Sequence, residues 1–175
     1  MELSSEPSEE TLRGLRICFT GLSSERERQL TEGLRRAGGS HAGPLTKDTT
    51  HLVAARVGSD KFRTALSLGM SVVEVRWLED CLRLGRRLDE RDYRPPPFLG
   101  LTITATQLTR DERQRLREAV ESHGGRYEQD LRPELCTHLI AERPEGDKYL
   151  LVRHSASVRV MRKEWVFACV REKCT

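Results

Sequence analysis

The sequence predicts an α/β protein made of two consecutive copies of one small module. Its 175 residues leave room for two domains of roughly 85 residues each. Five short motifs recur in the same order, the first displaced by 86 positions (Gly100 against Gly14, 100 − 14 = 86). Within each copy, apolar segments with strand character alternate with segments of helical periodicity. These three observations favour a repeated α/β module over one larger domain.

The repeated motifs keep their order while their displacement grows only from 86 to 88 positions. They are a strand ending in threonine, a glycine pair, a Thr-His-Leu segment, a segment with lysine before an aromatic residue, and a Trp-x-x-x-Cys segment. With the second copy given after the first, they are 14–20 and 100–106, 38–39 and 124–125, 50–54 and 137–141, 58–62 and 145–149, and 77–81 and 165–169. This agreement predicts that the two halves fold alike.

Each copy is expected to begin with a strand, over 15–20 and 101–106, followed by an amphipathic helix. One face of each helix carries apolar residues three or four positions apart, a spacing that directs them onto a sheet. These residues are Leu30, Leu34 and Ala37 in the first copy and Leu116, Ala119 and Val120 in the second.

Capping boxes and glycine pairs mark the bounds of these two helices. A capping box satisfies free amides at a helix start, and glycine accepts the left-handed conformation needed at a helix end. The boxes are Ser24-x-x-Glu27 and Thr109-x-x-Glu112, and the pairs are Gly38-Gly39 and Gly124-Gly125.

Three further strands and two helices complete each copy. After a short strand, the apolar Thr-His-Leu segment is typical of a strand buried in a parallel sheet. Its histidines, His51 and His138, are expected to be core or strand-end residues and not catalysts. A short helix then follows the lysine of the next motif. The last strands are expected over 72–75 and 158–161, and the tryptophan helix closes each copy.

Composition separates the copies from their flanking segments. Residues 1–11 are acidic and rich in serine and glutamate, and are expected to be disordered. Residues 89–97 are charged and end in three prolines, which favour a stiff, extended chain. The expected domains are therefore 12–92 and 98–175, joined by a proline-rich linker over 93–97.

The bulk properties exclude several classes of protein. No apolar run approaches the ~18 residues that span a bilayer, and the first residues do not resemble a signal sequence. Five cysteines without a CxxC pair favour reduced thiols, and we expect no metal and no cofactor; these are Cys18, Cys81, Cys136, Cys169 and Cys174. The net charge of +3 arises from 30 basic and 27 acidic residues that are interspersed, so an anion site must come from local geometry.

The glycine pair, the Thr-His-Leu strand and the Trp-x-x-x-Cys helix resemble the BRCT domain over nearly all of residues 12–175. The resemblance implies, in each copy, a four-stranded parallel sheet flanked by three helices. It also implies a core role for Trp77 and Trp165 and a structural role for the glycine pairs.

The chain is most similar to the amino-terminal BRCT pair of the topoisomerase II-binding protein family of replication and checkpoint scaffolds. Segments 18–20, 46–52 and 58–62 carry this likeness. The BRCT repeats of the epithelial cell transforming Rho exchange factor are nearly as similar, through 18–21 and 61–69. Both families imply recognition of phosphorylated peptides.

A phosphoserine or phosphothreonine carries about −1.5 to −2 charges and three acceptor oxygens. The resemblance implies that it is held by a threonine hydroxyl, by the next backbone amide near a helix start, and by a lysine opening the second helix. In the second copy these residues, with an arginine, are Thr106, Gln107 through its backbone, Arg113 and Lys148. In the first copy they are Thr20, Gly21 through its backbone, and Lys61.

The two sites are not expected to be equal. At the position of Arg113 the first copy has Glu27, flanked by Arg26 and Arg28, which helical geometry directs elsewhere. A guanidinium offers a fork of donors to phosphate, so the second copy is expected to bind more strongly.

The function expected is that of a nuclear, monomeric scaffold that recruits proteins with phosphoserine or phosphothreonine tails, such as checkpoint clamp or replication-initiation factors. Direct binding of DNA ends or forks is an alternative, although no basic stripe interleaved with aromatic residues is present. A third hypothesis is a module that packs against partner proteins without binding phosphate. We expect no enzyme, because no phosphate loop or nucleophile elbow occurs.

Overall fold

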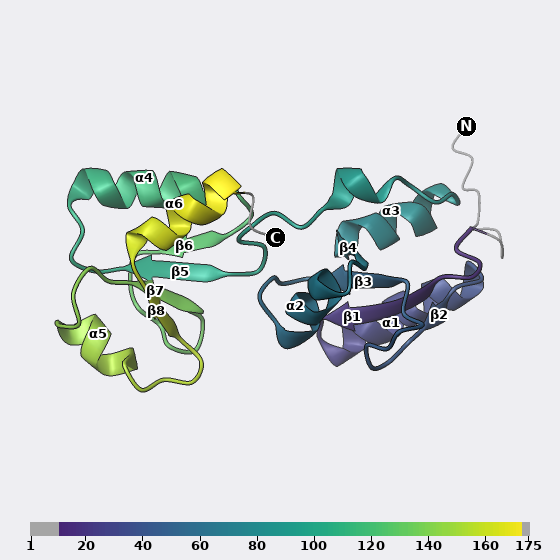
Figure 1. Cartoon of the computed structure of the whole chain (residues 1–175), viewed down its shortest axis with the longest axis horizontal. Coiled ribbons are helices and arrows are strands. Elements are labelled where there is room, and N and C mark those ends of the chain that lie inside the picture. Colours follow the sequence, from purple (N-terminus) through teal and green to yellow (C-terminus); the bar gives the residue numbers. More distant parts are fainter. Residues whose placement is uncertain (1–10, 173–175) are drawn as a thin grey trace. The chain divides into compact units, whose positions relative to one another are not determined.

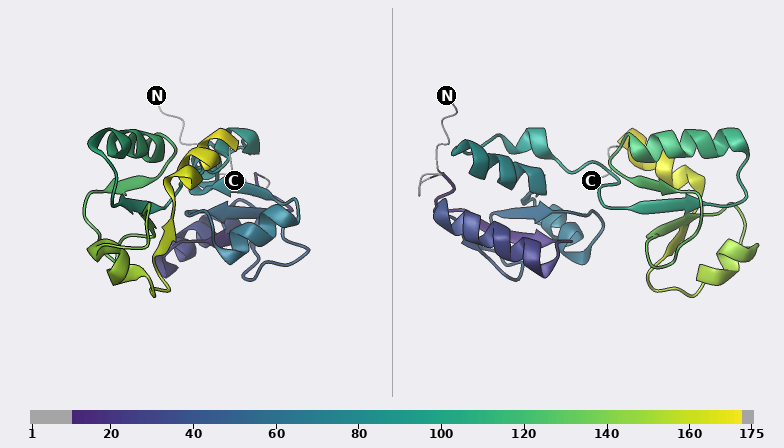
Figure 2. Two further views of the ribbon diagram at one scale, coloured as in Figure 1. Left: turned by 60° about the vertical axis from the view of Figure 1, so that its left-hand side comes forward. Right: turned by 180° about the vertical axis from the view of Figure 1, so that it is seen from behind.

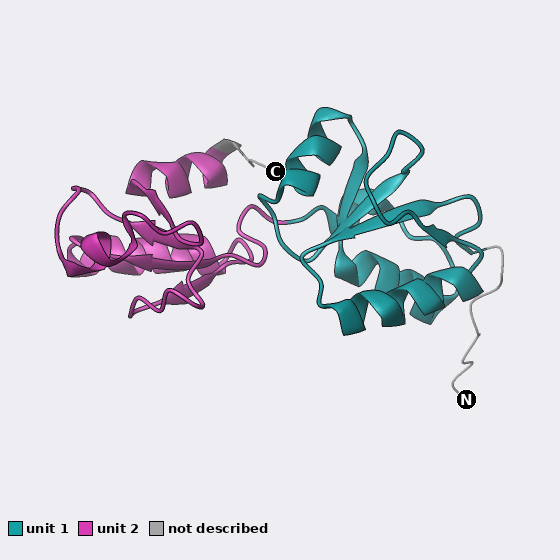
Figure 3. Ribbon diagram, turned by 90° about the horizontal axis from the view of Figure 1, so that it is seen from below, with its two compact units in different colours: residues 1–95 teal, residues 96–175 magenta. Residues whose placement is uncertain are grey.

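A computed structural model describes residues 11–172 of the chain, and its secondary structure agrees with the predicted repeat. Two compact units divide it, residues 1–95 and residues 96–175 (Figure 3). The segment 1–10 and Cys174 lie outside the described residues. None of the described helices is long and apolar enough to cross a membrane.

The first unit is a parallel sheet in the order β2-β1-β3-β4. The two central strands are almost wholly buried, as their continuous apolar sequences predict. α1 packs against α3 and β2, whereas α2 packs against β3 and β4. The elements are β1 (Arg16–Thr20), α1 (Ser24–Arg36), β2 (Ser40–His41), β3 (His51–Ala54), α2 (Asp60–Ser67), β4 (Ser71–Glu74), α3 (Val75–Leu84) and the 3₁₀ helix η1 (Glu90–Tyr93).

The second unit repeats this plan with a parallel sheet in the order β6-β5-β7-β8. α4 and α6 lie together on one face of this sheet and α5 on the other (Figures 1 and 2). The elements are β5 (Thr102–Ala105), α4 (Arg110–Glu121), β6 (Arg126–Glu128), β7 (His138–Ile140), α5 (Asp147–Val152), β8 (Arg159–Met161) and α6 (Lys163–Glu172). The predicted α/β class, with two four-stranded parallel sheets, is confirmed.

The strand register gives a precise correspondence between the units. Ile17 pairs with His41 in the first sheet, and Ile103 pairs with Tyr127 in the second. Both members of the second pair lie 86 positions after those of the first (103 − 17 and 127 − 41). An offset of 86 therefore relates equivalent residues from the first strand to the second.

The glycine pairs end the first helix of each unit, as predicted. Gly38 and Gly124 have φ angles of 80° and 83°, which a side chain would disfavour. Their partners leave no room for a side chain, since a Cβ on Gly39 would lie 2.3 Å from Leu34 Cδ1. A Cβ on Gly125 would lie 2.8 Å from Phe98 Cβ.

The histidines of the central strands stack on the tryptophans. His51 lies 5.1 Å from Trp77 and His138 lies 4.9 Å from Trp165, with nearly parallel rings. Both histidines are buried, and the same stack occurs in both units, which agrees with the structural role predicted for them.

The two tryptophans differ in burial, contrary to the equal core role expected of them. Trp77 is fully buried, and its indole N–H donates to the Leu88 carbonyl at 3.0 Å. Trp165 is only partly buried. The difference arises because the segment after α3 returns over Trp77, with Leu88 and Tyr93 packed on that core. The described residues of the second unit end with α6.

The connector between the units is partly incorporated into them. Tyr93, expected in the linker, donates a hydrogen bond to Asp80 at 2.9 Å and belongs to the first unit. The Phe98 amide donates to the His123 carbonyl at 3.0 Å in the second unit. Thr11, expected in the disordered segment, instead donates its hydroxyl to the Gly85 carbonyl at 3.1 Å.

One predicted capping box is wrong. Ser23, not Ser24, caps α1 and accepts from the Arg26 amide, so Glu27 lies one position too far along for a box. In α4 the box of Thr109 and Glu112 is present in both directions. Ser23 lies 86 positions before Thr109, so the two helices start at equivalent residues.

Candidate functional site

The two lysines at matching positions of the repeat contact equivalent carbonyls in both units. Lys61 Nζ donates to the carbonyls of Phe19 at 3.2 Å and Gly43 at 3.4 Å. Lys148 Nζ donates to the carbonyls of Ala105 at 3.3 Å and Gln129 at 2.7 Å. Both acceptors in the second unit lie 86 positions after those in the first (105 − 19 and 129 − 43).

Local structure explains where these ammonium groups lie. In each unit the lysine is the second residue of the helix that follows the third strand, and it reaches back to the carboxyl end of the first strand. The carboxyl ends of central parallel strands are where open α/β sheets commonly bind ligands. Each ammonium therefore contacts the carbonyl of the residue just before the threonine that is predicted to bind phosphate.

In the first unit that threonine is already hydrogen-bonded. Thr20 is buried, and its hydroxyl lies 2.8 Å from the hydroxyl of Ser59, the residue that caps α2. Gly21 follows with φ of 78°. A Cβ there would lie 3.1 Å from Arg56 Cβ and 3.2 Å from the Arg56 amide, so glycine permits a close approach of two backbone segments.

In the second unit the threonine has a freer hydroxyl. Thr106 is partly exposed, and within residues 11–172 its hydroxyl makes no hydrogen bond. The reason is local, because Gly146 takes the helix-capping position that Ser59 has in the first unit. A hydroxyl without a protein partner at the surface is available to an incoming acceptor.

Gln107 replaces Gly21 and has φ of 61°, the only positive φ of a non-glycine residue in the described chain. Its side-chain amide donates to the Glu145 carbonyl at 2.6 Å and accepts from the Arg143 amide at 2.8 Å. These bonds join the loop after β5 to the loop before α5. The sequence predicts a role only for the Gln107 backbone. The signal available was the exchange of glycine for glutamine between otherwise matching positions.

The backbone amides that are predicted to bind phosphate donate no hydrogen bond within the described residues. Among residues 11–172, the amides of Gly21 and Gln107 donate to no protein acceptor. Both lie just before the first turn of α1 or α4, where free amides and the helix dipole favour an anion.

Positive charge gathers more densely in the second unit. The guanidinium of Arg113 donates to the Leu108 carbonyl at 3.0 and 3.3 Å. The pKa of Lys148 lies below its usual value, first because burial disfavours the charged form and then because Arg113 is close; Asp130 opposes this shift. The two cations contact carbonyls three residues apart, those of Ala105 and Leu108, and together they are suited to a dianion.

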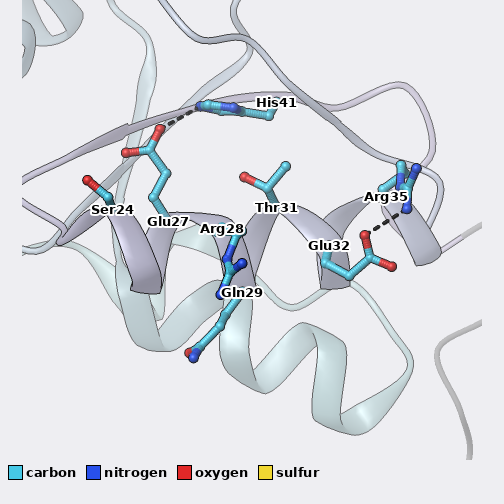
Figure 4. Close-up of a pocket in the computed structure, with 8 residues that line it drawn as sticks. All are labelled: Ser24, Glu27, Arg28, Gln29, Thr31, Glu32, Arg35 and His41. Carbon is cyan, nitrogen blue, oxygen red and sulfur yellow. Dashed lines mark hydrogen bonds and ion pairs between the residues drawn. The ribbon is translucent and has the colours of Figure 1, made fainter.

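The equivalent position in the first unit carries the opposite charge. Glu27 points towards β2, with its Oε1 3.2 Å from His41 Nε2 (Figure 4). The neighbouring arginines are directed elsewhere, as predicted: Arg26 pairs with Glu79 on α3, and Arg28 pairs with Glu25 at 2.6 Å. The first unit thus combines a threonine, a free amide and one lysine, without the arginine.

Comparison with known proteins agrees with this architecture. A profile of the twin BRCT domain matches residues 15–77, and a profile of the BRCA1 C-terminus (BRCT) domain matches residues 94–170. Human Protein ECT2 is 27% identical over 173 residues, which cover 92% of this chain and 18% of ECT2. The S-M checkpoint control protein rad4 of Schizosaccharomyces pombe is 25% identical over 173 residues, covering 94% of this chain and 26% of rad4. The chain therefore spans between about a fifth and a quarter of the length of these relatives.

A solved structure shows the same fold. The first two BRCT domains of Rad4, crystallised with a Crb2 phosphopeptide, superpose with a TM-score of 0.68 at 24% identity. The match covers 95% of this chain and 93% of that one. A second crystal structure of the same domains, with an Mdb1 phosphopeptide, gives a TM-score of 0.70 over 92% of each chain.

Proposed function

The chain belongs to the BRCT family, and we propose that it is a tandem module that binds peptides carrying phosphoserine or phosphothreonine. The observation that supports this most directly is the repeated lysine geometry. In each unit an ammonium group lies at the end of the first strand, beside a threonine and a free backbone amide. These are the donors that a phosphate dianion requires.

The phosphate-binding groups we propose for the second unit are the Thr106 hydroxyl, the Gln107 amide, the Arg113 guanidinium and the Lys148 ammonium. For the first unit they are the Thr20 hydroxyl, the Gly21 amide and the Lys61 ammonium. We propose that the second site is the stronger, since it adds a guanidinium and its threonine hydroxyl makes no hydrogen bond within residues 11–172.

The cellular role we propose is that of a nuclear scaffold, acting by binding and not by catalysis. It would recruit phosphorylated partners in replication initiation or in the DNA-damage checkpoint, checkpoint clamp and replication-initiation factors among them. Rad4, whose first two BRCT domains bind phosphopeptides in crystals, supports this reading. The similarity to ECT2 supports a second role of the same chemistry, in which the phosphorylated partner acts in cytokinesis.

The test is a pull-down from a phosphopeptide library, with the same library dephosphorylated as the control. Selective retention of phosphopeptides by the intact chain, and its loss in the double variant Lys61→Ala/Lys148→Ala, is the expected result. Lys47→Ala, which removes an exposed lysine from the loop between β2 and β3, is the matched control and should leave retention unchanged. Equal retention of both libraries, or salt-sensitive binding of plain DNA instead, would refute the proposal.

A further inference from the structure

We propose that the second unit selects an acidic residue beside the phosphorylated residue, and that the first unit selects against one. The selecting surface is the face of α4 next to β6, and its counterpart in the first unit is the face of α1 next to β2. This inference rests on the proposed phosphopeptide binding and adds to it a difference in what the two sites read.

In the second unit the positive charge of the phosphate site continues along α4. Arg117 lies one helical turn after Arg113, and its guanidinium carbon is 5.0 Å from the centre of the Tyr127 ring on β6. Burial raises the pKa of Tyr127, while the charges of Arg113 and Arg117 oppose that rise. Lys148 contacts the Gln129 carbonyl just after β6, Arg117 lies over Tyr127 on β6, and Arg113 lies one turn before Arg117 on α4. These three cations therefore lie along the side of α4 next to β6.

The equivalent face of the first unit carries different chemistry. The common offset of 86, fixed by the helix caps and the strand register, matches Arg113 with Glu27, Arg117 with Thr31, and Tyr127 with His41. Glu27, Thr31 and His41 line one groove on the surface of α1 (Figure 4). The first unit thus has a carboxylate, a hydroxyl and an imidazole where the second unit has two guanidinium groups and a phenol ring.

The neighbouring charges do not restore the balance. On α1, Glu32 and two arginines also line the groove, and both arginines are paired with carboxylates (Figure 4). Arg35 donates to Glu32 at 2.7 Å and Arg28 donates to Glu25 at 2.6 Å. On β6, Glu128 is paired with Arg126 at 2.7 Å. Asp130 is the carboxylate that acts on Lys148, and it lies on the loop after β6. The cationic row on α4 therefore remains available to a ligand.

The size of the selection follows from the exposure of the groups. A solvent-exposed ion pair contributes modestly, so one acidic residue facing Arg117 is expected to strengthen binding by about two- to fivefold. In the first unit, an acidic residue near Glu27 is expected to weaken binding by a similar factor. The effect is expected to shrink as salt is raised, because exposed charges are screened.

The experiment uses the full chain with one site disabled. The Lys61→Ala chain reports on the second site and the Lys148→Ala chain on the first. Each is offered a phosphoserine-centred library in which the flanking positions vary among aspartate, alanine and lysine. Aspartate should be enriched by the Lys61→Ala chain and depleted by the Lys148→Ala chain.

Two variants connect this selection to the proposed residues. Adding Arg117→Ala to the Lys61→Ala chain should abolish the enrichment of aspartate while phosphopeptides are still retained. Arg115→Ala is the matched control, because Arg115 lies on the same helix but faces the α6 side, next to Phe167. The exchange Glu27→Arg/Thr31→Arg in the Lys148→Ala chain should reverse the depletion of aspartate at the first site.

The possible outcomes separate the two proposals. Phosphopeptide retention without any difference between the sites, or with a difference that Arg117→Ala and the exchange leave unchanged, would overturn the selection and leave the phosphate sites standing. If no phosphopeptide were retained by either chain, both the proposed function and the selection would fail.

Discussion

The ranking of the two sites gives the sharpest quantitative prediction. The Lys61→Ala chain keeps the second site and the Lys148→Ala chain keeps the first, so their affinities for one monophosphorylated peptide compare the sites directly. The peptide should have neutral flanking residues, so that only phosphate chemistry is measured. We expect the Lys61→Ala chain to bind more tightly.

The magnitude comes from Arg113. A hydrogen bond to a charged group contributes about 1.5–3 kcal/mol, which corresponds to between about tenfold and a hundredfold in the dissociation constant. The lower end applies, because the guanidinium already donates twice to the Leu108 carbonyl and must exchange at least one of these bonds. The Thr20 hydroxyl shares a hydrogen bond with Ser59, in which either oxygen can be the donor, whereas that of Thr106 makes no hydrogen bond within residues 11–172. The second site should therefore bind about tenfold more tightly.

Fluorescence anisotropy with a labelled phosphopeptide measures both constants, and the unphosphorylated peptide is the blank. Adding Arg113→Ala to the Lys61→Ala chain should reduce its affinity to that of the first site. Arg110→Ala, at the first residue of the same helix, is the control for general loss of charge. Equal dissociation constants for the two single-site chains would refute the reasoning.

Three further predictions concern the second unit and its differences from the first. Gln107→Ala should lower the free energy of unfolding by about 1–3 kcal/mol, because two hydrogen bonds are lost and the positive φ remains. Gln107→Gly should recover about 1 kcal/mol of this loss, because glycine accepts a positive φ. Unfolding in urea measures both values. Lys163 and the helix cap hold the pKa of the Glu112 carboxyl at about 2, so the stability it contributes is complete above its usual value of 4.5 and is lost as pH falls towards 2. Glu112→Gln should flatten the unfolding midpoint between pH 5 and pH 2, and an unchanged slope would contradict the assignment. Trp77→Ala should cost about 3–5 kcal/mol, and Trp165→Ala clearly less because that ring is partly exposed.

The fold was largely predictable, because the features that specify it are local or repeated. The buried strands are continuous apolar runs, and each amphipathic helix has one apolar face, with Leu34 and Leu116 fully buried. The glycine pairs indicate a positive φ angle at the end of each first helix, a conformation that other residues rarely adopt. Each strand or helix predicted in the first copy can also be compared with the matching segment of the second copy, so the repeat supports the assignment.

The differences from the sequence predictions have two sources. Ser23 and Ser24 are both good helix caps, and the box pattern favoured Ser24. The constant offset of 86 from Thr109 would have selected Ser23, so the information was present in the repeat. The differing burial of the tryptophans depends instead on a returning chain segment, which no pattern around Trp165 reveals.

The site was predictable in its residues but not in its surroundings. The positions of Lys61 and Lys148 followed from the repeated motif. The contacts that distinguish the copies come from segments distant in sequence: Ser59 on Thr20, and the pairing of Gln107 with the loop before α5. Such contacts depend on how loops approach one another, and no spacing rule encodes them.

The way the two copies differ indicates which features are constrained. At the third position of the first helix, Arg26 pairs with Glu79 in one unit, and Glu112 pairs with Lys163 at 2.7 Å in the other. The polarity of this pair is reversed, yet the helices it joins are the same, so packing there tolerates either sign.

The lysines, by contrast, donate to the carbonyls of equivalent residues in the two units. A charge that only joins two helices needs a partner of opposite sign, and the partner can change with it. A charge that meets an external dianion has no such freedom, because the ligand fixes its sign. Retention of the ammonium in both units, beside helix faces that carry different charged residues, is therefore what two phosphate sites with different preferences for flanking residues would require.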